Sequence, residues 1–454
     1  MKRDLNQGSI IKNLFVMSVQ TMFGMLSQMI YDLVDIFWIG KLSAEAVAGV
    51  TIFSSIFWLL NTPNDIIGQS SISLISQRYG ANDEEGTKKA IEQTITFKVL
   101  IALVMVGASL LFIKPLIGLF SSEKVVVDAA LNYGYLRLFF LPMMFSSYSV
   151  NTILRCLGDA KTPMYIMFFS SIINIILDPL LMFDIIPGTS IRGVGMGIQG
   201  VAFATIISQS LAFIIGFVYI FRGKAGIKPS LKGLFKLDKI IGIKLLTIGL
   251  PNGLEALSRN IAGVICMRFV AIYGTAVVAA YGVASRIFGL AFMPLIGFSM
   301  GGSAIVGQSL GAENIERSKK TAGYSSLISG VVMLFFGVIA FTLGDNVISI
   351  FNNTPEIVFY GAQFLQFGSI GLSFLGFAFG FSIVFSGSGY NFPFVIGSVV
   401  SRWFIQVPIL LIAILWLKLD VAWVWLSYVF SDIGESIVFF IFYKKGKWKT
   451  KRVK

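Results

Sequence analysis

The chain has 454 residues, of which 56% are hydrophobic and only 13% are charged. A soluble domain carries about 25% charged residues, so a chain this apolar cannot cover a water-facing surface, which excludes a large soluble protein. The formal net charge of +13 does not indicate nucleic-acid binding, because the basic residues gather in short loops and a tail, as membrane-orientation signals do. Histidine is absent, so any proton chemistry must use carboxylates, with tyrosine as a further candidate.

Long apolar runs predict about twelve membrane-spanning helices. Ile10–Gly40 is too long for a cleavable signal peptide and lacks a small-residue cleavage site, so we interpret it as the first span. The first six spans are expected near residues 12–39, 46–76, 90–114, 126–155, 161–183 and 196–221. The next six are expected near residues 239–271, 276–306, 318–342, 356–386, 392–417 and 421–443. The expected fold class is therefore an all-α membrane protein.

The basic residues are distributed unevenly over the loops. The termini and the loops after spans two, four, six, eight and ten hold 25 Lys and Arg residues, whereas the other side holds five. The positive-inside rule then places both termini in the cytoplasm and supports an even number of spans. We interpret the basic, glycine-containing segment 222–238 as a cytoplasmic linker between two halves, 1–221 and 239–454, the second of which ends in a basic tail.

An internal repeat relates the two halves, because several short motifs recur in the same order and at a nearly constant offset. The matches are Ser54-x-Ile56-Phe57 with Ser285-x-Ile287-Phe288, Pro63 with Pro294, Gln77-Arg-Tyr-Gly80-Ala81 with Gln308-Ser-Leu-Gly311-Ala312, and Pro163 with Pro393. Six spans in each half mean that both halves enter the membrane in the same direction. We therefore expect two six-helix lobes related by a pseudo-two-fold axis along the membrane normal, with a substrate site between them.

Ionisable residues inside spans are costly and usually functional. Asp32 and Asp35 lie three residues apart in span one, and Asn174 and Asp178 share one helix face in span five, where Pro179 disturbs the preceding turn. Asp35 and Asp178 both lie near the outer ends of their spans, so we expect them to meet. Two carboxylates held together away from water cannot both stay ionised, which suits them to bind and release a proton or small cation. The alternatives are solvated interfacial carboxylates and polar helix contacts.

The second half carries a different set of charges. Glu255 and Arg259 lie four residues apart in span seven and either neutralise each other or contact a substrate. Further charges in the spans of this half are Arg268, Arg286, Arg402, Asp432 and Glu435. We take Glu255, Arg259, Arg286 and Arg402 as a candidate substrate or polar site of the second lobe.

Ion coupling is expected in the first lobe only, because Cys266 and Pro408 replace the acids at the positions that match Asp35 and Asp178. No P-loop is present, so the chain is not expected to hydrolyse ATP, and no enzyme signature or cofactor site is expected. Cys156 and Cys266 fall in apolar helical stretches and are interpreted as buried packing residues.

The order and spacing of several motifs resemble the multidrug and toxic compound extrusion (MATE) family over nearly the whole chain. In the first half these motifs are Val34-Asp35-Ile-Phe-Trp-Ile39-Gly40, Gln77-Arg-Tyr-Gly80-Ala81, Gly158-Asp-Ala-Lys-Thr-Pro163-Met164, Asn174-Ile-Ile-Leu-Asp178-Pro179 and Gly200-Val-Ala-Phe-Ala-Thr205. In the second half they are Ala279-Ala-Tyr281-Gly282, Pro294 and Val306-Gly-Gln-Ser-Leu-Gly311-Ala312. The Asn-x-x-x-Asp-Pro form in span five is similar to the DinF-like branch.

The resemblance implies two six-helix lobes around a central cavity and antiport of organic cations or other toxic amphiphiles against H⁺ or Na⁺. It places the ion-coupling site on Asp35, Asn174 and Asp178, where Na⁺ is an alternative to a proton, and adds Thr205 and Tyr133, with Tyr135 competing for the last role. Another branch of the family has an acid in span seven, but Glu255 lies nearer to Pro251 than that position requires.

Other interpretations remain open at this stage. A lipid-linked precursor flippase of the same superfamily would use a cationic cavity, for which Arg259, Arg286 and Arg402 are candidates. A major-facilitator transporter also has six plus six spans, and a non-transporting membrane sensor or scaffold is an alternative of a different class. The favoured expectation is a multi-pass protein of a prokaryotic inner membrane that acts as a monomer on small organic cations, with the lipid bilayer as its other partner.

Overall fold

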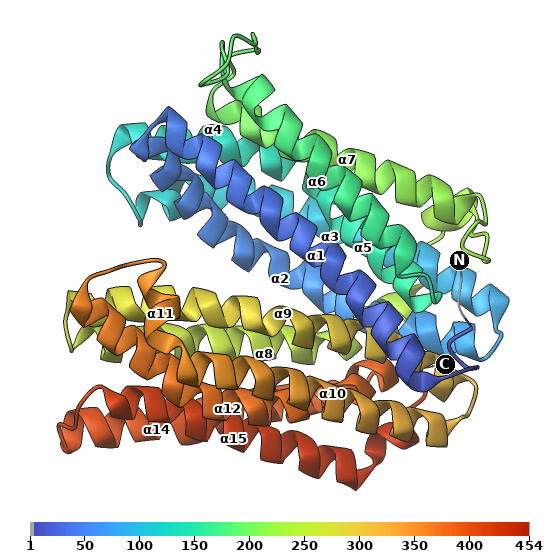
Figure 1. Cartoon of the computed structure of the whole chain (residues 1–454). Coiled ribbons are helices and arrows are strands. Elements are labelled where there is room, and N and C mark those ends of the chain that lie inside the picture. Colours follow the sequence, from blue (N-terminus) through green and yellow to red (C-terminus); the bar gives the residue numbers. More distant parts are fainter. Residues whose placement is uncertain (1–3, 454) are drawn as a thin grey trace. The chain divides into compact units, whose positions relative to one another are not determined.

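The computed structural model describes residues 4–453, which fold almost entirely into helices (Figure 1). In chain order the elements are α1 (Ile10–Leu42), α2 (Ala44–Gly80), α3 (Glu84–Gly118), α4 (Lys124–Phe139), α5 (Leu141–Cys156), α6 (Lys161–Met182), α7 (Ile198–Phe221), η1 (Leu231–Phe235), α8 (Lys239–Ala271), α9 (Thr275–Gly311), α10 (Ile315–Thr342), α11 (Gly344–Ser349), α12 (Pro355–Ser388), α13 (Phe392–Ser398), η2 (Val399–Gln406), α14 (Val407–Leu410), η3 (Leu411–Trp416), α15 (Ala422–Lys445) and η4 (Lys447–Lys449). The elements η1 and η4 are short 3₁₀ helices, and η2 and η3 are π-helical turns.

Within residues 4–453, eleven helical segments are long and apolar enough to cross a membrane. The remaining predicted span, 126–155, is divided into α4 and α5, each of 16 residues. The division falls at Phe140, just before Pro142, because a proline has no backbone N–H to donate and so favours the first turn of a new helix. The expectation of an all-helical membrane protein with about twelve spans is confirmed.

The residues cluster by contacts into two compact units. The first contains residues 20–71 and 83–246, and the second contains residues 4–19, 72–82 and 247–453. The N-terminal end of α1 and the C-terminal end of α2 thus count with the second unit. The expected lobes, 1–221 and 239–454 with the linker 222–238, stay a prediction.

In the first unit α7 packs against α4, α5 and α6, while α3 packs against α4 and α5. Its apolar core lies near those helix ends that are expected to face the outside of the cell. There Phe53 packs edge-on against Tyr133, with 5.5 Å between ring centroids. Gly134 leaves room for this ring, since a Cβ at that residue would lie 2.5 Å from the Phe53 side chain.

The linker is held on α3 by side chains that bind its backbone. A carboxylate oxygen of Glu92 accepts from the backbone N–H of Ser230 at 2.6 Å. The amide of Gln93 donates to the carbonyl of Lys236 and accepts from the N–H of Asp238, at 2.6 and 2.9 Å. The short helix η1 is therefore docked and is not a free connection.

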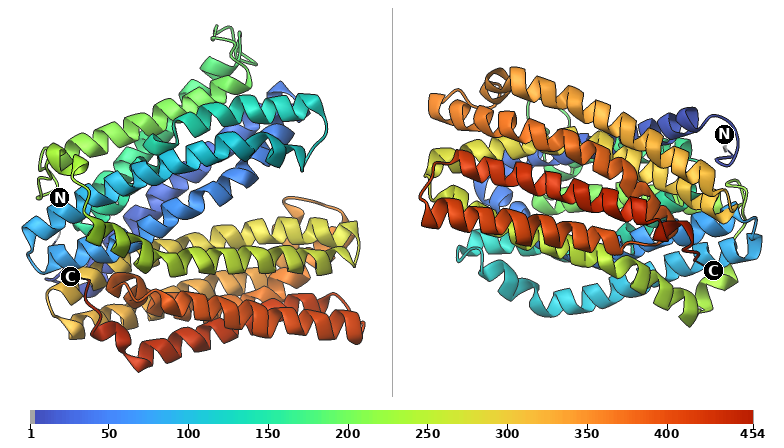
Figure 2. Two further views of the ribbon diagram at one scale, coloured as in Figure 1. Left: turned by 180° about the vertical axis from the view of Figure 1, so that it is seen from behind. Right: turned by 90° about the horizontal axis from the view of Figure 1, so that it is seen from below.

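In the second unit α12 is the central helix, because α9, α10 and α15 all pack against it. These helices, coloured yellow to red, run side by side in both views of Figure 2. The core is rich in aromatic rings, and Phe364 packs edge-on against both Tyr281 and Trp425, with centroid distances of 5.4 and 4.8 Å. The tail folds back on this unit, since the backbone N–H of Val453 donates to Gln77 at 2.9 Å.

The two copies of the repeated motif contact each other reciprocally. A Cβ on Gly80 would lie 2.0 Å from the carbonyl oxygen of Gln308, and a Cβ on Gly311 would lie 1.9 Å from the carbonyl oxygen of Gln77. Each glycine thus lets its helix approach the backbone of the other copy. This exchange of partners is what a local two-fold relation between the motifs predicts.

Replacement of Gly80 with Ala should lower stability by about 1–3 kcal/mol, because the added methyl group has no room against the Gln308 backbone. The measurement is the Tm of the detergent-purified protein. Gly107→Ala is the matched control, since nothing lies within 4 Å of a Cβ at this helical residue. An equal Tm for the two variants would contradict the close contact.

Candidate functional site

Three polar side chains of α1 and α6 come together inside the first unit. Asp35 is 7% exposed, and Asn174 and Asp178 are completely buried. The Asn174 amide donates to Oδ1 of Asp178 over 3.4 Å, as the four-residue spacing on one helix face predicts. The carboxyl group of Asp35 lies within hydrogen-bonding reach of that of Asp178 and beside the hydroxyl of Thr205 on α7.

This site holds more acceptor oxygens than donors. The hydroxyl of Thr205 donates to the carbonyl of Val201 at 3.0 Å. Among the described residues, Oδ1 of Asp35, Oδ2 of Asp178 and Oδ1 of Asn174 are buried and have no hydrogen-bond partner. Unpaired buried acceptors are costly, so the site is suited to receive a proton or a small cation.

A guanidinium group stands next to these acids. Arg137, in the last turn of α4, donates from Nη1 to the hydroxyl of Tyr133 at 2.6 Å and stacks over Phe57 at 4.7 Å from the ring centroid. Its Nε is buried without a hydrogen-bond partner among residues 4–453, and its charge interacts with that of Asp35. Tyr133 is 2% exposed, whereas Tyr135 is 42% exposed, so of these two tyrosines only Tyr133 belongs to the site.

Sequence reasoning did not single out Arg137, although a signal was present. The residue lies near the middle of the predicted span 126–155, where an arginine is as unusual as an aspartate. Asp65 on α2 and Lys98 on α3 are also ionisable residues inside predicted spans, and sequence reasoning did not single them out either. Asp32, one turn before Asp35, has an exposed side chain.

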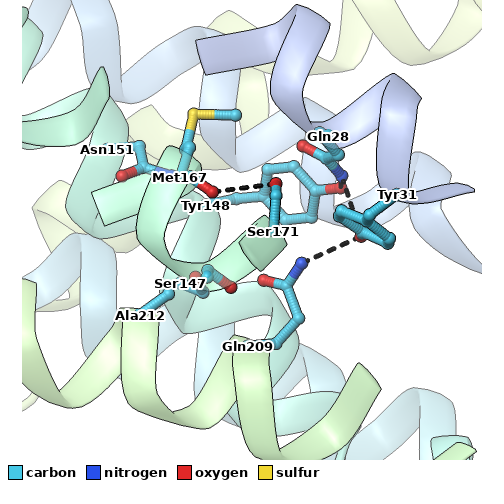
Figure 3. Close-up of a pocket in the computed structure, with 10 residues that line it drawn as sticks. Gln28, Tyr31, Ser147, Tyr148, Asn151, Met167, Ser171, Gln209 and Ala212 are labelled. Carbon is cyan, nitrogen blue, oxygen red and sulfur yellow. Dashed lines mark hydrogen bonds between the residues drawn. The ribbon is translucent and has the colours of Figure 1, made fainter. Parts of the chain in front are cut away.

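A small polar pocket is lined by side chains of α1, α5, α6 and α7, of which α1, α6 and α7 also carry residues of the acid site (Figure 3). Gln28 donates to the hydroxyl of Tyr148 at 3.0 Å, and Gln209 donates to the hydroxyl of Tyr31 at 3.1 Å. The pocket is small, with room for about one water molecule. Oδ1 of Asn151, on the same wall, is buried and has no partner among the described groups, so it can accept from a molecule in the pocket.

The second unit contains a network of five charges. Arg259 donates to Glu255 at 2.7 Å and to Glu435 at 2.9 Å. Arg402 lies 3.3 Å from Asp432 and 3.9 Å from Glu435, so Glu435 joins both arginines. The side chain of Glu435 is 1% exposed, compared with 20% for Glu255.

The turn that carries Arg402 is π-helical, and such turns are frequent at functional sites. Arg402 also donates to Gln406 at 3.0 Å. Arg286, on α9, has an exposed side chain and forms no ion pair with this network within the described part of the chain. The structure therefore brings together Glu255, Arg259 and Arg402 but not Arg286.

No group of three or more His, Cys, Asp and Glu side chains that could hold a metal ion occurs among residues 4–453. The nearest arrangement is the oxygen set of Asp35, Asn174 and Asp178, which contains two carboxylates and one amide. These are the ligand types that a small hard cation prefers, although the nearby charge of Arg137 opposes a second cation. Such an ion would be a transported species.

In the comparison with known proteins, one family model matches two separate stretches of the chain. The MatE family model matches residues 21–180 and again residues 251–412, so each half of the chain contains one copy. The chain is 26% identical to the probable multidrug resistance protein YoeA of Bacillus subtilis, over 98% of this chain and 96% of the relative. It is 24% identical to the probable multidrug resistance protein NorM of Thermotoga maritima, over 98% of this chain and 94% of the relative.

Solved structures share the fold. A MOP superfamily transporter from Pyrococcus furiosus, reported for the reverse polarity of its binding pocket, superposes with a TM-score of 0.88 at 24% identity, over 97% of this chain and 96% of the other. An outward-facing multidrug resistance MATE transporter superposes with a TM-score of 0.86 at 24% identity, over the same shares. The internal repeat predicted from the recurring motifs is confirmed by the two matches to one family model.

Replacement of Glu435 with Gln should destabilise the second unit by about 3–5 kcal/mol, because it leaves the buried Arg402 and the partly exposed Arg259 short of a counter-charge. Glu255→Gln should cost clearly less, since Glu255 is partly exposed and contacts only one of them. The measurement is the Tm of both variants in the same detergent. A larger decrease for Glu255→Gln would contradict the central position of Glu435 in the network.

Proposed function

This chain belongs to the MatE family, and from that premise we propose that it is a secondary active efflux transporter. It exchanges organic cations or other toxic amphiphiles for H⁺ or Na⁺ by alternating access. Members of the family are transport proteins and not enzymes, and the names of the relatives YoeA, NorM and MepA all refer to multidrug resistance or export. The expected place is a prokaryotic inner membrane, with both termini in the cytoplasm and the protein acting as a monomer.

The observation that carries the coupling proposal is the pair of carboxyl groups at Asp35 and Asp178. They lie within hydrogen-bonding reach of each other, away from water, and each has an oxygen without a partner among the described groups. Two negative charges at this separation repel strongly, so one proton or cation relieves the repulsion. Loading and unloading of this site therefore changes the charge inside the first lobe.

The exchange follows because the organic cation and the coupling ion compete for the negative charge of Asp35 and Asp178. With the acids unloaded, the lobe is negative and attracts an organic cation. Arrival of the coupling ion on Asp35 and Asp178 removes the attraction, so the cation leaves on the outer side. Asn174 orients Asp178 through its amide, and Thr205 supplies a hydroxyl beside Asp35. Binding of one cation at the expense of the other is what antiport requires.

We favour a proton over Na⁺ as the coupling ion. Only three oxygens at the site lack a hydrogen-bond partner among the described groups, which is fewer than a Na⁺ ion without its water shell needs. Arg137 also places a fixed positive charge near the site. A proton needs only one oxygen and one acceptor, which the two carboxyl groups supply. Tyr133 holds the guanidinium by its hydroxyl and so keeps this charge at a fixed distance.

The lipid-linked precursor flippase is not favoured. A phosphate-bearing substrate needs an excess of positive charge, whereas the network of Arg259 and Arg402 also contains Glu255, Asp432 and Glu435. If all five groups are ionised, this network carries a net charge of −1. The relatives' names also refer to drug resistance or export.

Replacement of Asp35 with Asn should abolish ion-driven efflux from proteoliposomes, by about a hundredfold or more, while the protein stays folded. The assay is the efflux of a fluorescent organic cation after a pH jump. Asp128→Asn is the matched control, because this α4 carboxylate is exposed. Unchanged efflux by the Asp35 variant would remove this residue from the mechanism.

A proton gradient alone should drive efflux, and a Na⁺ gradient at equal pH should not. The two gradients are imposed separately on the same proteoliposomes, with an ionophore that collapses each as its control. Efflux that requires Na⁺ would contradict the preference for a proton and leave the acid site as a sodium site.

A further inference from the structure

A cluster of cations follows the last span, at residues 444–453, which we call the basic segment. It begins in the last turn of α15 and contains no acidic residue. Its cations are Lys444, Lys445, Lys447, Lys449, Lys451 and Arg452. Orientation of the chain in the membrane explains positive charge at this place, but it does not require these residues to take a fixed structure. The basic segment nevertheless has one.

Trp448 anchors the basic segment to the second unit. The chain turns at Gly446, which ends α15 in a left-handed backbone conformation with φ 71°. The Trp448 side chain is completely buried, stacks on Tyr443 with 5.8 Å between ring centroids, and donates from Nε1 to the Tyr443 carbonyl at 3.0 Å. It packs in one apolar cluster with Phe385 and Phe439. Burial of so large a ring fixes the position of the residues on both sides of it.

Val453 provides a second anchor. Its backbone N–H donates to Oε1 of Gln77 at 2.9 Å, and the amide of the same glutamine donates to the carbonyl of Gly387 at 2.9 Å. The Val453 side chain lies against Gly389, where a Cβ would come within 3.0 Å of its Cγ2. Gly389 is the residue at which α12 ends. The basic segment is therefore fastened to the C-terminal ends of α2 and α12.

The lysines of the basic segment have no acidic partner. Four of them are exposed and form no ion pair with residues 4–453, namely Lys444, Lys445, Lys447 and Lys451. Two lysines of other segments do pair, since Lys88 lies 2.9 Å from Glu84 and Lys319 lies 3.2 Å from Glu316. The counter-charge for the basic segment therefore has to come from outside these residues.

The sequence of α15 puts these cations at the depth of lipid headgroups. Ile437, Phe440 and Ile441 are exposed apolar residues of this spanning helix, so they face the hydrocarbon of the bilayer. Lys444 follows Phe440 by four residues, which places it on the same face and about 6 Å further along the axis. Its Nζ lies 5.4 Å from the centroid of the Phe440 ring. The change from apolar to basic within one turn marks the boundary between hydrocarbon and headgroups.

An anionic phospholipid fits both features of this surface. Clusters of Lys and Arg directly beside a spanning helix attract anionic headgroups, and an ammonium binds phosphate as a point charge. A free anion or a nucleic acid would meet the same charges, but it would gain nothing from the exposed apolar stripe that leads up to Lys444. A lipid contacts the lysines with its headgroup and the stripe with its acyl chains.

We propose that the basic segment is a docking surface for anionic phospholipid headgroups of the cytoplasmic leaflet, with Trp448 and Val453 holding its lysines in position. Because Gln77 bonds to both Val453 and Gly387, a lipid that holds the segment also stabilises the contact between the ends of α2 and α12. The lipid contact involves neither Asp35 nor Asp178, so it goes beyond the proposed function and does not depend on ion coupling.

Thermal unfolding in mixed micelles tests the proposal. The purified full-length chain is placed in a neutral detergent with phosphatidylglycerol or, at the same lipid content, with zwitterionic phosphatidylcholine, and the Tm is measured in both. The test variant removes three charges and keeps both anchors, through Lys447→Gln, Lys449→Gln and Lys451→Gln. The matched control removes three exposed charges of the linker, through Lys224→Gln, Lys228→Gln and Lys232→Gln.

Phosphatidylglycerol should raise the Tm of the parent protein and of the linker variant by about 3 °C or more relative to phosphatidylcholine. In the test variant this difference should fall to less than about half of the parent's value, because most of the fixed charge is gone. An unchanged difference in the test variant would overturn the proposal. An equal loss in the linker variant would also overturn it, since surface charge in general would then explain the effect.

Trp448→Ala distinguishes a fixed surface from a loose basic tail, because it removes one anchor and keeps every charge. The difference between the two lipids, measured on this variant itself, should again fall to less than about half. A full difference would contradict the docking surface, since the lysines would then act without a fixed position. If Trp448→Ala does not fold, Val453→Gly decides in the same way, because it removes the apolar side chain of the other anchor.

Discussion

The cost of burying charge in a medium without water is the constraint on which this structure depends. Each ionisable side chain in the spans must find a partner, share a proton or reach a polar pocket. The second unit meets this requirement with a closed set of pairs, in which Glu435 joins Arg259 and Arg402. The first unit meets it incompletely, since Asp35 and Asp178 each keep an oxygen without a hydrogen-bond partner among the described groups. The two halves share a repeated motif order but differ in whether their charge can change.

That difference explains why coupling is assigned to the first lobe. A network in which every acid contacts an arginine gains less from a proton than acids without a counter-ion do. Two adjacent carboxyl groups gain strongly from one, so protonation can alter the packing of the helices that carry them. Arg137 sets the balance between these states, because its charge favours ionised acids and Tyr133 keeps it in place.

Much of this arrangement could be predicted from sequence, because the spacing of residues along a helix fixes which of them share a face. Asp178 and Asn174 had to share a face, and the position of Asp35 in span one put it at the same depth. The pairing of Arg259 with Glu435, 176 residues later, could not be predicted, because it depends on how α8 and α15 pack. Arg137 and Lys98 carried a readable signal, a cation inside an apolar span, but their partners come from other helices. The break at Phe140 was not predicted, although Pro142 gave a signal for it, and its consequence for the position of Arg137 needed the fold.

The central claim is that a transported cation and a proton compete for the Asp35–Asp178 site. The most direct measurement is the number of protons released when a fluorescent organic cation binds to the purified protein in weakly buffered detergent solution near neutral pH. The account predicts the release of about one proton for each cation bound, and none from the Asp35→Asn variant. Binding of the cation to the parent protein with no proton release would contradict it.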